Sequence, residues 1–443
     1  MALAQLPGIS PRHVIGASAL GALFEWYDFF MYGSLAVLLG KLFFPPGDPT
    51  TGFLSSLATF GAGFVVRPFG SLLFGRLGDL LGRKPTFLLT IMIMGVSTLL
   101  VGLLPTYGQI GAAAPAMLVG LRLIQGLALG GEYGGAATVV AEHAPPQRRG
   151  FATSWIQITT PLGFLLSLAV ILSVRLLVGE AAFTAWGWRV PFLASSVLLA
   201  VSLRLRLRLE ESPAFSQLKR ARRLSSTPLG DAFGNRRNRR LLLLSLLGIT
   251  AGQGVVSFTI HFYALFFLQH TLNVESVTAY LLVGSAMLIG TPLIVFFGAL
   301  SDRIGAQPIM VTGMGLAAIG YLPLFRALTR AVNPHHPQPF DPALLNGPLA
   351  VALLTMMMIM AAMVYGPVTA RLVDLFPTEI RYTSISLPFH LGNGWFGGLL
   401  PLIAAFFVIK TGNIYAGLYY PIGVCVMSIL VSLIFLRPKR NQA

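Results

Sequence analysis

The chain carries few charged residues for its length. Of its 443 residues, 10% are Asp, Glu, Lys or Arg, while 55% are hydrophobic and the mean hydropathy is +0.75. Soluble proteins carry a charge on about a quarter of their residues. This scarcity of charge excludes an ordinary water-soluble domain and predicts an integral membrane protein.

Cysteine and nucleotide-binding motifs are scarce as well. The single Cys425 lies in the last apolar stretch, so neither an intrachain disulfide nor a cysteine-based metal site is possible. The phosphate-binding pattern G-x-x-x-x-G-K-[ST] is absent, because the only Gly-Lys pair is Gly40-Lys41. We therefore expect a protein that is not an enzyme, uses no ATP and holds neither a metal nor another cofactor.

One pattern imitates a nucleotide site. Gly392, Gly394 and Gly397 spell G-x-G-x-x-G, the dinucleotide fingerprint, which requires a preceding strand and a βαβ unit. Here the glycines lie inside an apolar run, where small residues let helices approach closely. The sequence therefore predicts close helix packing or a bend at this place.

Long apolar runs are what the sequence has in abundance. A hydrocarbon core of about 30 Å needs roughly 20 mostly apolar residues in a helix. No run alternates polar and apolar residues as the strands of a membrane barrel do, so we expect an all-α membrane protein. Twelve transmembrane helices are predicted, at 14–40, 52–75, 86–104, 115–140, 151–177, 188–207, 241–268, 276–299, 309–327, 348–370, 383–409 and 414–436.

The basic residues indicate how the chain is oriented. The formal net charge is +16, from 31 Lys and Arg against 15 Asp and Glu, but these residues lie in loops and form no single patch for nucleic acid. One set of loops is rich in basic residues and carries Arg76, Arg83, Lys84, Arg148, Arg149 and the segment 208–240. The loops on the opposite side have few charges, mainly Lys41, Glu180, Glu275, Arg326, Arg330 and Lys410. The positive-inside rule then places the rich loops and both termini in the cytoplasm. We expect a multi-pass protein of the bacterial inner membrane, with basic residues that set topology and contact anionic lipid.

Two short patterns occur twice, once in each half of the chain. Gly75, Asp79, Gly82 and Pro85 recur at identical spacing as Gly298, Asp302, Gly305 and Pro308, and Glu142, Pro145 and Arg149 recur as Asp374, Pro377 and Arg381. Each copy follows the corresponding helix of a set of six. Such parallel repeats predict a transporter made of two six-helix halves with a site between them near the membrane midplane. We expect the halves at 1–207 and 241–443, joined by a basic cytoplasmic linker at 208–240.

These motifs resemble those of a known family. GRLGDLLGRKP is similar to the cytoplasmic loop signature of the major facilitator superfamily, and RLIQGLALG resembles its fourth-helix motif. Within that superfamily, LFEWYDFFMYG, FVVRPFG, GGEYGGA, WGWRVPF, LFPTEIRYT and GNGWFGG resemble the metabolite:proton symporter family. The resemblance runs over nearly the whole chain, and it implies uptake of organic acids or of zwitterions such as proline and betaine.

The resemblance also implies a charge latch between cytoplasmic helix ends that holds the outward-open state. The candidate gating residues are Asp79, Arg83, Glu142, Arg149, Asp302, Asp374 and Arg381. The second-half loop departs from the first at two cationic positions, where Ala306 replaces Arg83 and Gln307 replaces Lys84. This departure weakens the expectation that both loops act alike.

Two carboxylates lie in the first predicted helix. Glu25 and Asp28 are three residues apart, so they share a face of the helix near the midplane. Two carboxylates this close in a dry setting favour a proton on at least one of them, as a proton-coupling site needs. The alternative is that one of them is a structural partner of Arg67 or Arg122. The candidate proton-coupling residues are Glu25, Asp28 and Glu132.

The fourth predicted helix carries an arginine and a glutamate. Arg122, Gln125, Leu129 and Glu132 follow one another at intervals of 3, 4 and 3 residues, which keeps them in one stripe. Charges in lipid need a partner or a water-filled cavity, and Arg122 and Glu132 are too far apart to pair. The resemblance implies that this helix and the first line the central cavity, where the charges could form a proton-and-substrate relay. The alternative is static packing.

Arg67, in the second predicted helix, is a further cation in an apolar run. It could hold a substrate carboxylate through a bidentate fork, or it could neutralise one of the acids. The second half offers polar groups that could orient a small solute in an apolar cavity, although His261 could equally be a structural histidine. The candidate substrate-binding residues are Arg67, Arg122, Gln125, Tyr133, His261, Tyr365 and Asn393.

The sequence therefore predicts a proton-coupled symporter that imports a small metabolite by alternating access. We favour a mono- or dicarboxylate, because Arg67, Arg122 and His261 are available to an anion. We expect a monomer whose partners are the substrate, protons and the lipid bilayer, and no nucleic acid. The alternatives are a symporter of a zwitterion or osmolyte such as proline or betaine, a drug-efflux antiporter, and a receptor that binds a metabolite without moving it.

Overall fold

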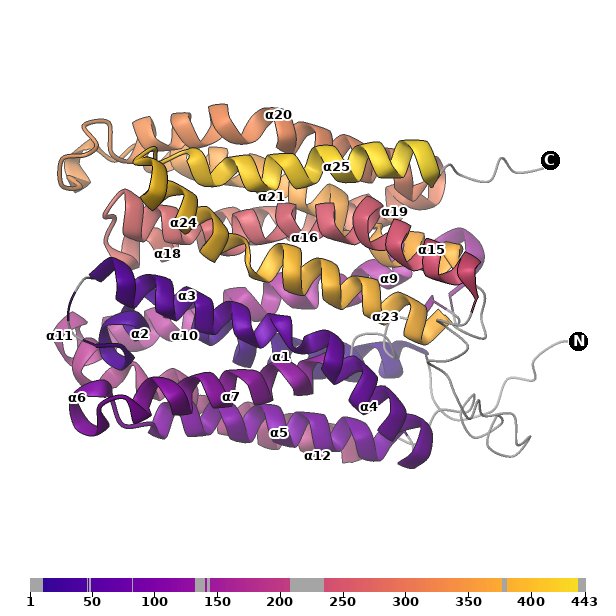
Figure 1. Cartoon of the computed structure of the whole chain (residues 1–443), viewed down its shortest axis with the longest axis horizontal. Coiled ribbons are helices and arrows are strands. Elements are labelled where there is room, and N and C mark those ends of the chain that lie inside the picture. The colour runs from indigo at the N-terminus through magenta and orange to yellow at the C-terminus, as the bar shows by residue number, and fades with distance from the viewer. Residues whose placement is uncertain are drawn as a thin grey trace, which may run out of the picture.

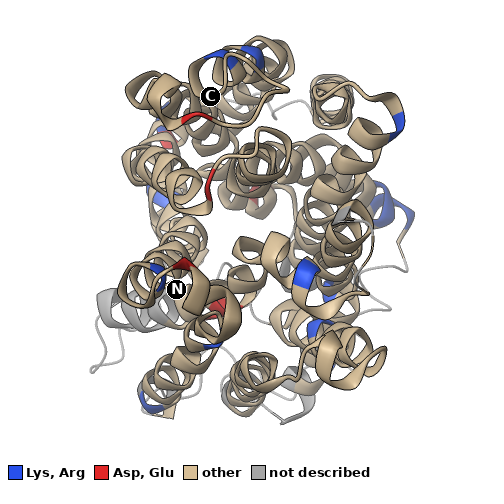
Figure 2. Ribbon diagram, turned by 90° about the vertical axis from the view of Figure 1, so that its left-hand side faces the viewer, with Lys and Arg blue, Asp and Glu red and all other residues tan. Residues whose placement is uncertain are grey.

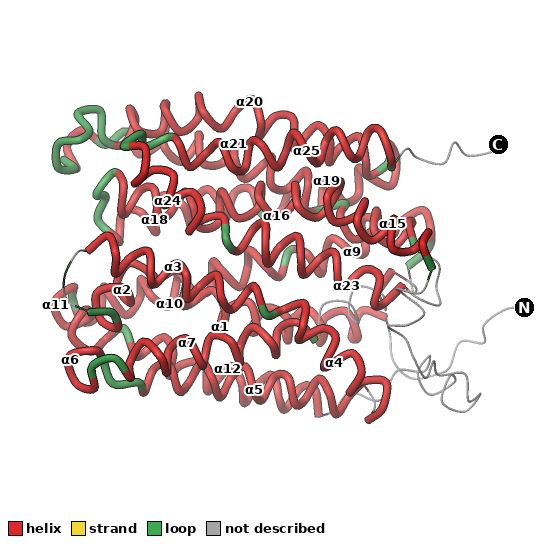
Figure 3. The backbone as a smooth tube through the Cα atoms, viewed as in Figure 1, coloured by secondary structure: helices red, strands yellow, loops and turns green. Residues whose placement is uncertain are grey.

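The computed structural model describes residues 11–45, 47, 49–81, 83–131, 140–141, 144–207, 235–376 and 381–436. Over these residues the backbone forms helices joined by loops and turns, with no strand (Figure 3). The all-helical architecture predicted from the apolar runs is therefore confirmed.

The helices follow one another along the chain with short connections. Up to residue 207 they are α1 (Pro11–Ser34), α2 (Ala36–Phe43), α3 (Pro49–Val65), α4 (Arg67–Leu81), α5 (Arg83–Leu103), α6 (Tyr107–Ile110), α7 (Ala113–Gly130), α9 (Arg149–Gln157), α10 (Thr159–Val178), α11 (Glu180–Ala182) and α12 (Arg189–Leu207). From residue 236 they are α15 (Arg236–Ser245), α16 (Ala251–Phe258), α17 (Ala264–Phe266), α18 (Ser276–Gly290), α19 (Pro292–Ile304), α20 (Ala306–Val332), α21 (Gly347–Tyr365), α22 (Val368–Leu375), α23 (Arg381–Leu391), α24 (Leu400–Thr411) and α25 (Tyr419–Phe435).

Each predicted membrane segment corresponds to helical structure in the described residues. Nine helical stretches there are long and apolar enough to cross a membrane. Two further segments are helix pairs that bend by 61°, Gly21–Ser34 with Ala36–Phe43 and Glu180–Gly187 with Arg189–Arg204. The shorter apolar helix Leu88–Leu103 lies where the third segment was predicted. The chain is a multi-pass membrane protein.

The helices run side by side in two groups, α1 to α12 and α15 to α25, with α4, α5, α7 and α12 of the first group in the lower part of the view, α18 to α21 and α25 of the second group in the upper part, and α9 and α23 between them (Figure 1). The groups meet where α9 packs on α19 and α22, α10 on α18, α3 on α24, and α4 on α23. Seen from the end that carries α6 and α11, most of the ribbon is uncharged and charged residues are scattered (Figure 2). Charges buried between these helices are therefore exceptional, and the few that occur are candidates for function.

The second group contains several π-helical turns. Three of them, η3 (Leu246–Thr250), η4 (Thr259–Tyr263) and η5 (Phe267–Thr271), belong to the seventh membrane segment, and η8 (Gly392–Gly398) belongs to the eleventh. Such turns widen a helix locally and are frequent at functional sites. The turns η4 and η8 carry His261 and Asn393, two of the predicted substrate-binding residues.

The G-x-G-x-x-G pattern lies in η8 and serves close packing. A methyl group on Gly392 would lie 2.5 Å from the backbone carbon of Thr250, and one on Gly394 would lie 2.7 Å from the carbonyl oxygen of Phe64. Glycine is therefore needed for η8 to contact η3 within its own group and α3 of the other group. Of the two outcomes predicted for this motif, close packing is the one observed.

Candidate functional site

Arg67 is a fully buried cation in the second membrane segment. Pro68 cannot donate to the carbonyl of Phe64, and the helix is interrupted directly before Arg67, where α3 gives way to α4. The guanidinium carbon lies 4.9 Å from the ring centre of Trp26, 5.2 Å from that of Phe64 and 5.8 Å from that of Phe29. Aromatic faces thus surround the charge.

Within the described part of the chain, none of the three guanidinium nitrogens of Arg67 has a hydrogen-bond partner. A desolvated contact between a cation and an aromatic face contributes about 2 kcal/mol. Leaving a buried charge unpaired costs more, on the order of 3 to 5 kcal/mol. The hydroxyl of Tyr365 lies within electrostatic range of Arg67. The fork of Arg67 is therefore free to bind an anionic group.

Arg122 in α7 is equally buried but is held by protein groups. Its Nη1 donates to Gln125 Oε1 at 2.7 Å and to the carbonyl of Phe29 at 3.4 Å. Gln125 Nε2 donates in turn to Thr98 Oγ1 at 2.9 Å, and Asp28 lies against Thr98. The hydroxyl of Thr98 itself donates to the carbonyl of Met94 at 3.0 Å, so the hydrogen bonds run from Arg122 as far as Thr98, and Asp28 lies beside their end.

Glu25 and Asp28 are both buried, each 6% exposed. Neither of them forms an ion pair with Arg67 or Arg122 in the described structure. The structural ion pair considered from the sequence is thus not present between these four side chains. Two acids and two arginines are thus buried in one group of helices, so a proton or a substrate can change the charge balance there.

A small cavity lies between the two groups of helices. It is lined by Trp26 and Phe30 of α1, Thr160 of α10, Ser257 and Phe258 of α16, His261 and Phe262 of η4, Tyr365 of α21 and Asn393 of η8. It has room for about one water molecule. Three of the predicted substrate-binding residues, His261, Tyr365 and Asn393, meet here, and Arg67 lies behind two of the lining residues, against the ring of Trp26 and within electrostatic range of Tyr365.

Hydrogen bonds fix the polar groups that line the cavity. Tyr365 donates to Thr160 Oγ1 at 2.8 Å, a contact between the two groups of helices. Asn393 and Gln253 exchange two amide hydrogen bonds, at 3.0 and 3.2 Å. The side chains are thereby held in place, which preorganises the cavity for a polar solute.

Sequence reasoning missed several members of this site. Thr98 and Thr160 each follow another hydroxyl residue, Ser97 and Thr159, in an apolar run, and nothing local distinguishes them from other threonines. Gln253 is a lone amide in an apolar run, which is a signal of the kind that singled out Gln125. Trp26 lies between the two first-helix carboxylates in the sequence, and this position could have identified it as a member of the site.

Some predicted residues cannot be placed. Glu132, Tyr133 and Glu142 lie outside the described residues, and so do the side chains of Asp79, Arg83 and Arg381.

Comparison with known proteins identifies the family. The model of the Major Facilitator Superfamily matches residues 18–387 and 257–443. The glycine betaine/proline/ectoine/pipecolic acid transporter OusA of Dickeya dadantii is 35% identical, over 97% of this chain and 84% of that protein. The alpha-ketoglutarate permease of Escherichia coli is 34% identical, over 97% of this chain and 94% of that protein. The chain belongs to the metabolite:proton symporter family of the Major Facilitator Superfamily.

A solved structure agrees on the fold. The partially occluded inward-open structure of the xylose transporter XylE from E. coli is similar with a TM-score of 0.73, covering 98% of this chain and 99% of that one. At 19% identity the likeness concerns the fold alone. The facilitator fold predicted from the repeated patterns is confirmed, and the protein is a transporter rather than an enzyme.

A facilitator must separate its two groups of helices at one end and then at the other. At the end that carries Arg148, Arg149 and Arg303, here called the basic end, Asp302 of α19 joins them. Its carboxylate accepts from the backbone N–H of Gly150 at 2.7 Å and of Phe151 at 2.9 Å, the first turn of α9. Asp302 therefore caps a helix of the other group.

Two further contacts close the basic end. A methyl group on Gly150 would overlap the carbonyl of Gly298 and the hydroxyl of Ser301, so α9 and α19 touch there through glycine. Arg149 Nη1 lies 3.9 Å from Asp374 Oδ1, with exposures of 28% and 57%, so this exposed pair contributes little. Of the predicted gating residues, Arg149, Asp302 and Asp374 thus meet at one contact between the groups.

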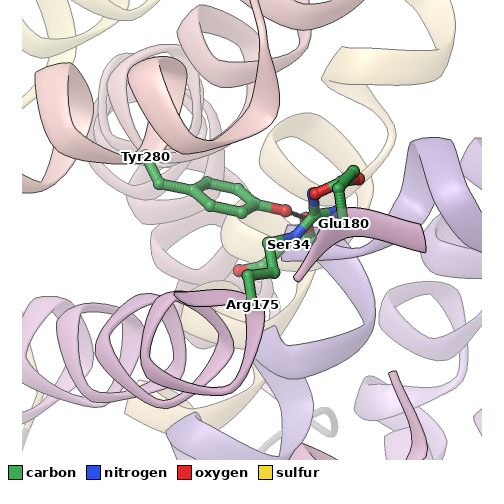
Figure 4. A network of polar contacts seen from close by, with 4 residues as sticks. All are labelled: Ser34, Arg175, Glu180 and Tyr280. Carbon is green, nitrogen blue, oxygen red and sulfur yellow. Dashed lines mark hydrogen bonds and ion pairs between the residues drawn. The ribbon is translucent and has the colours of Figure 1, made fainter. Parts of the chain in front are cut away.

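The opposite end is closed by a different set of residues (Figure 4). Tyr280 of α18 donates to the carbonyl of Ser34 at 2.7 Å, at the break between α1 and α2. Arg175, 5.7 Å from the Tyr280 ring centre, donates to Glu180 Oε1 at 2.6 Å. The bend of the first segment ends α1 at Ser34 and leaves that carbonyl available to the other group. In the described structure, contacts between the two groups of helices thus lie at both ends of the molecule, with the central cavity between them.

Proposed function

We propose that the protein is a symporter that couples inward proton movement to uptake of a small mono- or dicarboxylate. The observation that carries this proposal is Arg67, a buried guanidinium without a hydrogen-bond partner in the described structure, next to Trp26 and Tyr365 of the cavity lining. A substrate carboxylate would supply the missing acceptors and the missing negative charge. The similarity to an alpha-ketoglutarate permease supports the same class of substrate.

The proton-coupling role falls to Asp28 in this proposal. Asp28 is buried and is connected through Thr98 and Gln125 to Arg122. A protonated Asp28 would have a hydrogen to donate to Thr98 and would thereby join this chain of hydrogen bonds, and a change in the position of Arg122 would alter Phe29, whose ring also borders Arg67. Glu25 and Glu132 stay candidates for the same role.

The rest of the proposal concerns the whole transporter. Residues 1–207 and 241–443 act as the two halves that rock against each other, joined by 208–240. The protein lies in the bacterial inner membrane with its basic end in the cytoplasm, as the positive-inside rule requires. The substrate then enters from the opposite end, beside Tyr280.

A zwitterion is the second candidate substrate, because a specific observation favours it. Trp26, Phe30, Phe258 and Phe262 line the cavity with aromatic faces, which attract an ammonium group. The similarity to a transporter of glycine betaine and proline agrees with this alternative. Arg67 would hold the carboxylate of an organic acid or of a zwitterion. The two classes of substrate therefore differ in their other functional group, which is an ammonium group only in the zwitterion.

Uptake into proteoliposomes tests the proposal. Purified protein is reconstituted, and accumulation of labelled organic acids is measured with and without an imposed pH gradient that is acidic outside. We expect accumulation only with the gradient. Equal accumulation in both conditions would contradict proton symport, and accumulation of betaine but of no organic acid would favour the zwitterion.

Replacement of Arg67 tests the carboxylate site itself. Arg67→Gln should abolish binding of the transported acid, and Arg67→Lys should weaken it at least about tenfold, because lysine cannot form the bidentate fork. Affinity is measured by isothermal titration of the full chain in detergent. Arg326→Gln, which changes a partly exposed arginine beside Tyr415, is the matched control and should bind normally. Normal affinity of Arg67→Gln would show that the carboxylate binds elsewhere.

A further inference from the structure

His261 projects an unpaired acceptor into the cavity. It is 4% exposed, lies in the π-helical turn η4 and lines the cavity. Its Nδ1 is bonded to the backbone carbonyl of Ser257, and its Nε2 has no partner within the described part of the chain. Of the side-chain polar atoms on the lining residues, Nε2 is the one that is buried and unpaired there.

The bond to Ser257 fixes the tautomer of the ring. A carbonyl oxygen can only accept a hydrogen bond, so Nδ1 must carry the hydrogen. No carboxylate lines the cavity, and Arg67 already places a positive charge close to its lining, so the imidazole is neutral. In a neutral ring whose Nδ1 carries the hydrogen, Nε2 has a lone pair and no hydrogen. The group that His261 offers to a substrate is an acceptor.

Three oxygen acceptors that line the cavity already receive a hydrogen bond. Thr160 Oγ1 accepts from Tyr365, and Ser257 Oγ and Asn393 Oδ1 both accept from Gln253. Among the side-chain polar atoms of the described lining residues, His261 Nε2 is therefore the buried acceptor without a partner, and the donors of Arg67 lie close to the lining residues Trp26 and Tyr365. A solute that satisfies both must carry an anionic group and an O–H or N–H donor.

We propose that His261 Nε2 accepts a hydrogen bond from the substrate and thereby selects carboxylates that also carry a hydroxyl or amino hydrogen over those that lack one. This inference rests on the proposed function, in which Arg67 holds the carboxylate. A substrate without the donor would leave Nε2 buried and unpaired, which is how sites built around a hydrogen bond reject analogues. Hydroxy acids satisfy this requirement, and so do amino acids with an N–H, whereas fully methylated betaines do not.

Matched pairs of ligands test the inference on the unmodified protein. The pairs are malate and succinate, lactate and propionate, and proline and N,N-dimethylproline; the members differ in the donor. Affinities of the full chain in detergent are measured by isothermal titration at one pH. In each pair that binds, we expect the member with the donor to bind at least about tenfold more tightly. The first two pairs report a hydroxyl donor, and the third reports an N–H donor.

Two variants then assign the preference to His261. The amide of glutamine can place its oxygen where Nε2 lies, whereas the shorter asparagine can replace only the Nδ1 contact to Ser257. His261→Gln should therefore keep the preference within about threefold, and His261→Asn should reduce it to about one. His335→Asn, the same change at an exposed histidine, should leave the preference unchanged.

The outcomes separate this inference from the proposed function. Equal binding of both members of a pair by the unmodified protein would overturn the role of His261 and leave the carboxylate site intact. A preference that survives in His261→Asn would overturn it as well. If no carboxylate binds in any pair, the proposed function fails and the inference falls with it.

Discussion

The two buried arginines of the first group of helices differ in what they bond to. Arg122 donates to Gln125 and to the carbonyl of Phe29, so part of its hydrogen-bonding capacity is met inside the protein. Arg67 has aromatic faces around it and no hydrogen bond in the described structure. Because a fully desolvated, unpaired cation is expensive, Arg67 is the better candidate for substrate and Arg122 for tuning a protein carboxylate.

A change at Asp28 tests this division of roles. Asp28→Asn fixes the side chain in a neutral form, so it should mimic the protonated state. We expect uptake driven by a pH gradient to fall at least about tenfold, while exchange of labelled for unlabelled substrate persists, because exchange needs no net proton movement. Both are measured in the same proteoliposomes.

The matched variant for Asp28→Asn is Glu25→Gln, which removes the same charge one helical turn away. If exchange is lost together with driven uptake in Asp28→Asn, Asp28 is needed for binding or for the structure. If Asp28→Asn behaves normally and Glu25→Gln loses driven uptake, the proton is carried by Glu25.

At the residue scale the sequence revealed the charges but not their partners. Glu25, Asp28, Arg67 and Arg122 stand out because ionised side chains are rare in apolar runs. Which of them would be paired could not be predicted, because Thr98 lies on a helix separated from Asp28 by many residues and is an ordinary threonine to the sequence. Pairing depends on which helices are neighbours.

At the scale of elements, the contact between α9 and α19 holds the basic end closed. Glycine at position 150 lets the two helices touch, and Asp302 caps the first turn of α9. Asp302 belongs to the second copy of a repeated pattern found in the sequence, whereas Gly150 follows directly after Arg149 of the other pattern and was not itself predicted. Asp302 was predicted as a gating residue, and the structure places it at a contact between the two groups of helices.

A bulky side chain at Gly150 should separate these helices. In Gly150→Val the new side chain would overlap the backbone of Gly298, so we expect the basic end to open. The measurement is the distance between spin labels at cysteines introduced for Arg148 and Arg303, two exposed residues on opposite sides of the contact. The distribution should shift to longer distances.

Gly315→Val is the control for that experiment. A methyl group on Gly315 in α20 meets nothing within 4 Å, so this variant makes the same change in open space and should leave the distances unaltered. An unchanged distribution in Gly150→Val as well would show that the close approach of α9 and α19 does not hold the end closed.

At the scale of the whole molecule, contacts between the two groups of helices lie at both ends. Asp302 with α9 joins the groups at the basic end, and Tyr280 with the carbonyl of Ser34 joins them at the opposite end. Between them, Phe262 packs on Phe30 and on Phe60 with ring centres 5.1 and 4.8 Å apart. Removing a contact at one end should favour the state that is open there.

Tyr280→Phe tests this expectation by removing one hydroxyl. A hydrogen bond of this kind contributes about 1 kcal/mol, so the population open at the opposite end should rise about fivefold. Spin labels at cysteines introduced for Lys41 and Glu275 report that end, and the labels at positions 148 and 303 report the basic end. Asp302→Ala should produce the converse change.

Tyr420→Phe is the matched control for Tyr280→Phe. The Tyr420 hydroxyl donates to the carbonyl of Phe396 at 3.1 Å, within one group of helices, so its loss should not shift the balance. If Tyr280→Phe and Tyr420→Phe give the same distributions, the contact with Ser34 does not stabilise the closed end.

The sequence by itself determined the membrane segments, the facilitator family and the buried charges, because apolar length, loop charge and short motifs are local properties of the chain. Only the tertiary structure decided that, among the described residues, Arg67 has no hydrogen-bond partner while Arg122 has one, that Asp302 caps a helix of the other group, and that Ser257 sets the tautomer of His261. These outcomes depend on how closely helices pack, and the approach of α9 to α19 and of η8 to η3 is set where glycines and backbone from distant parts of the chain come together.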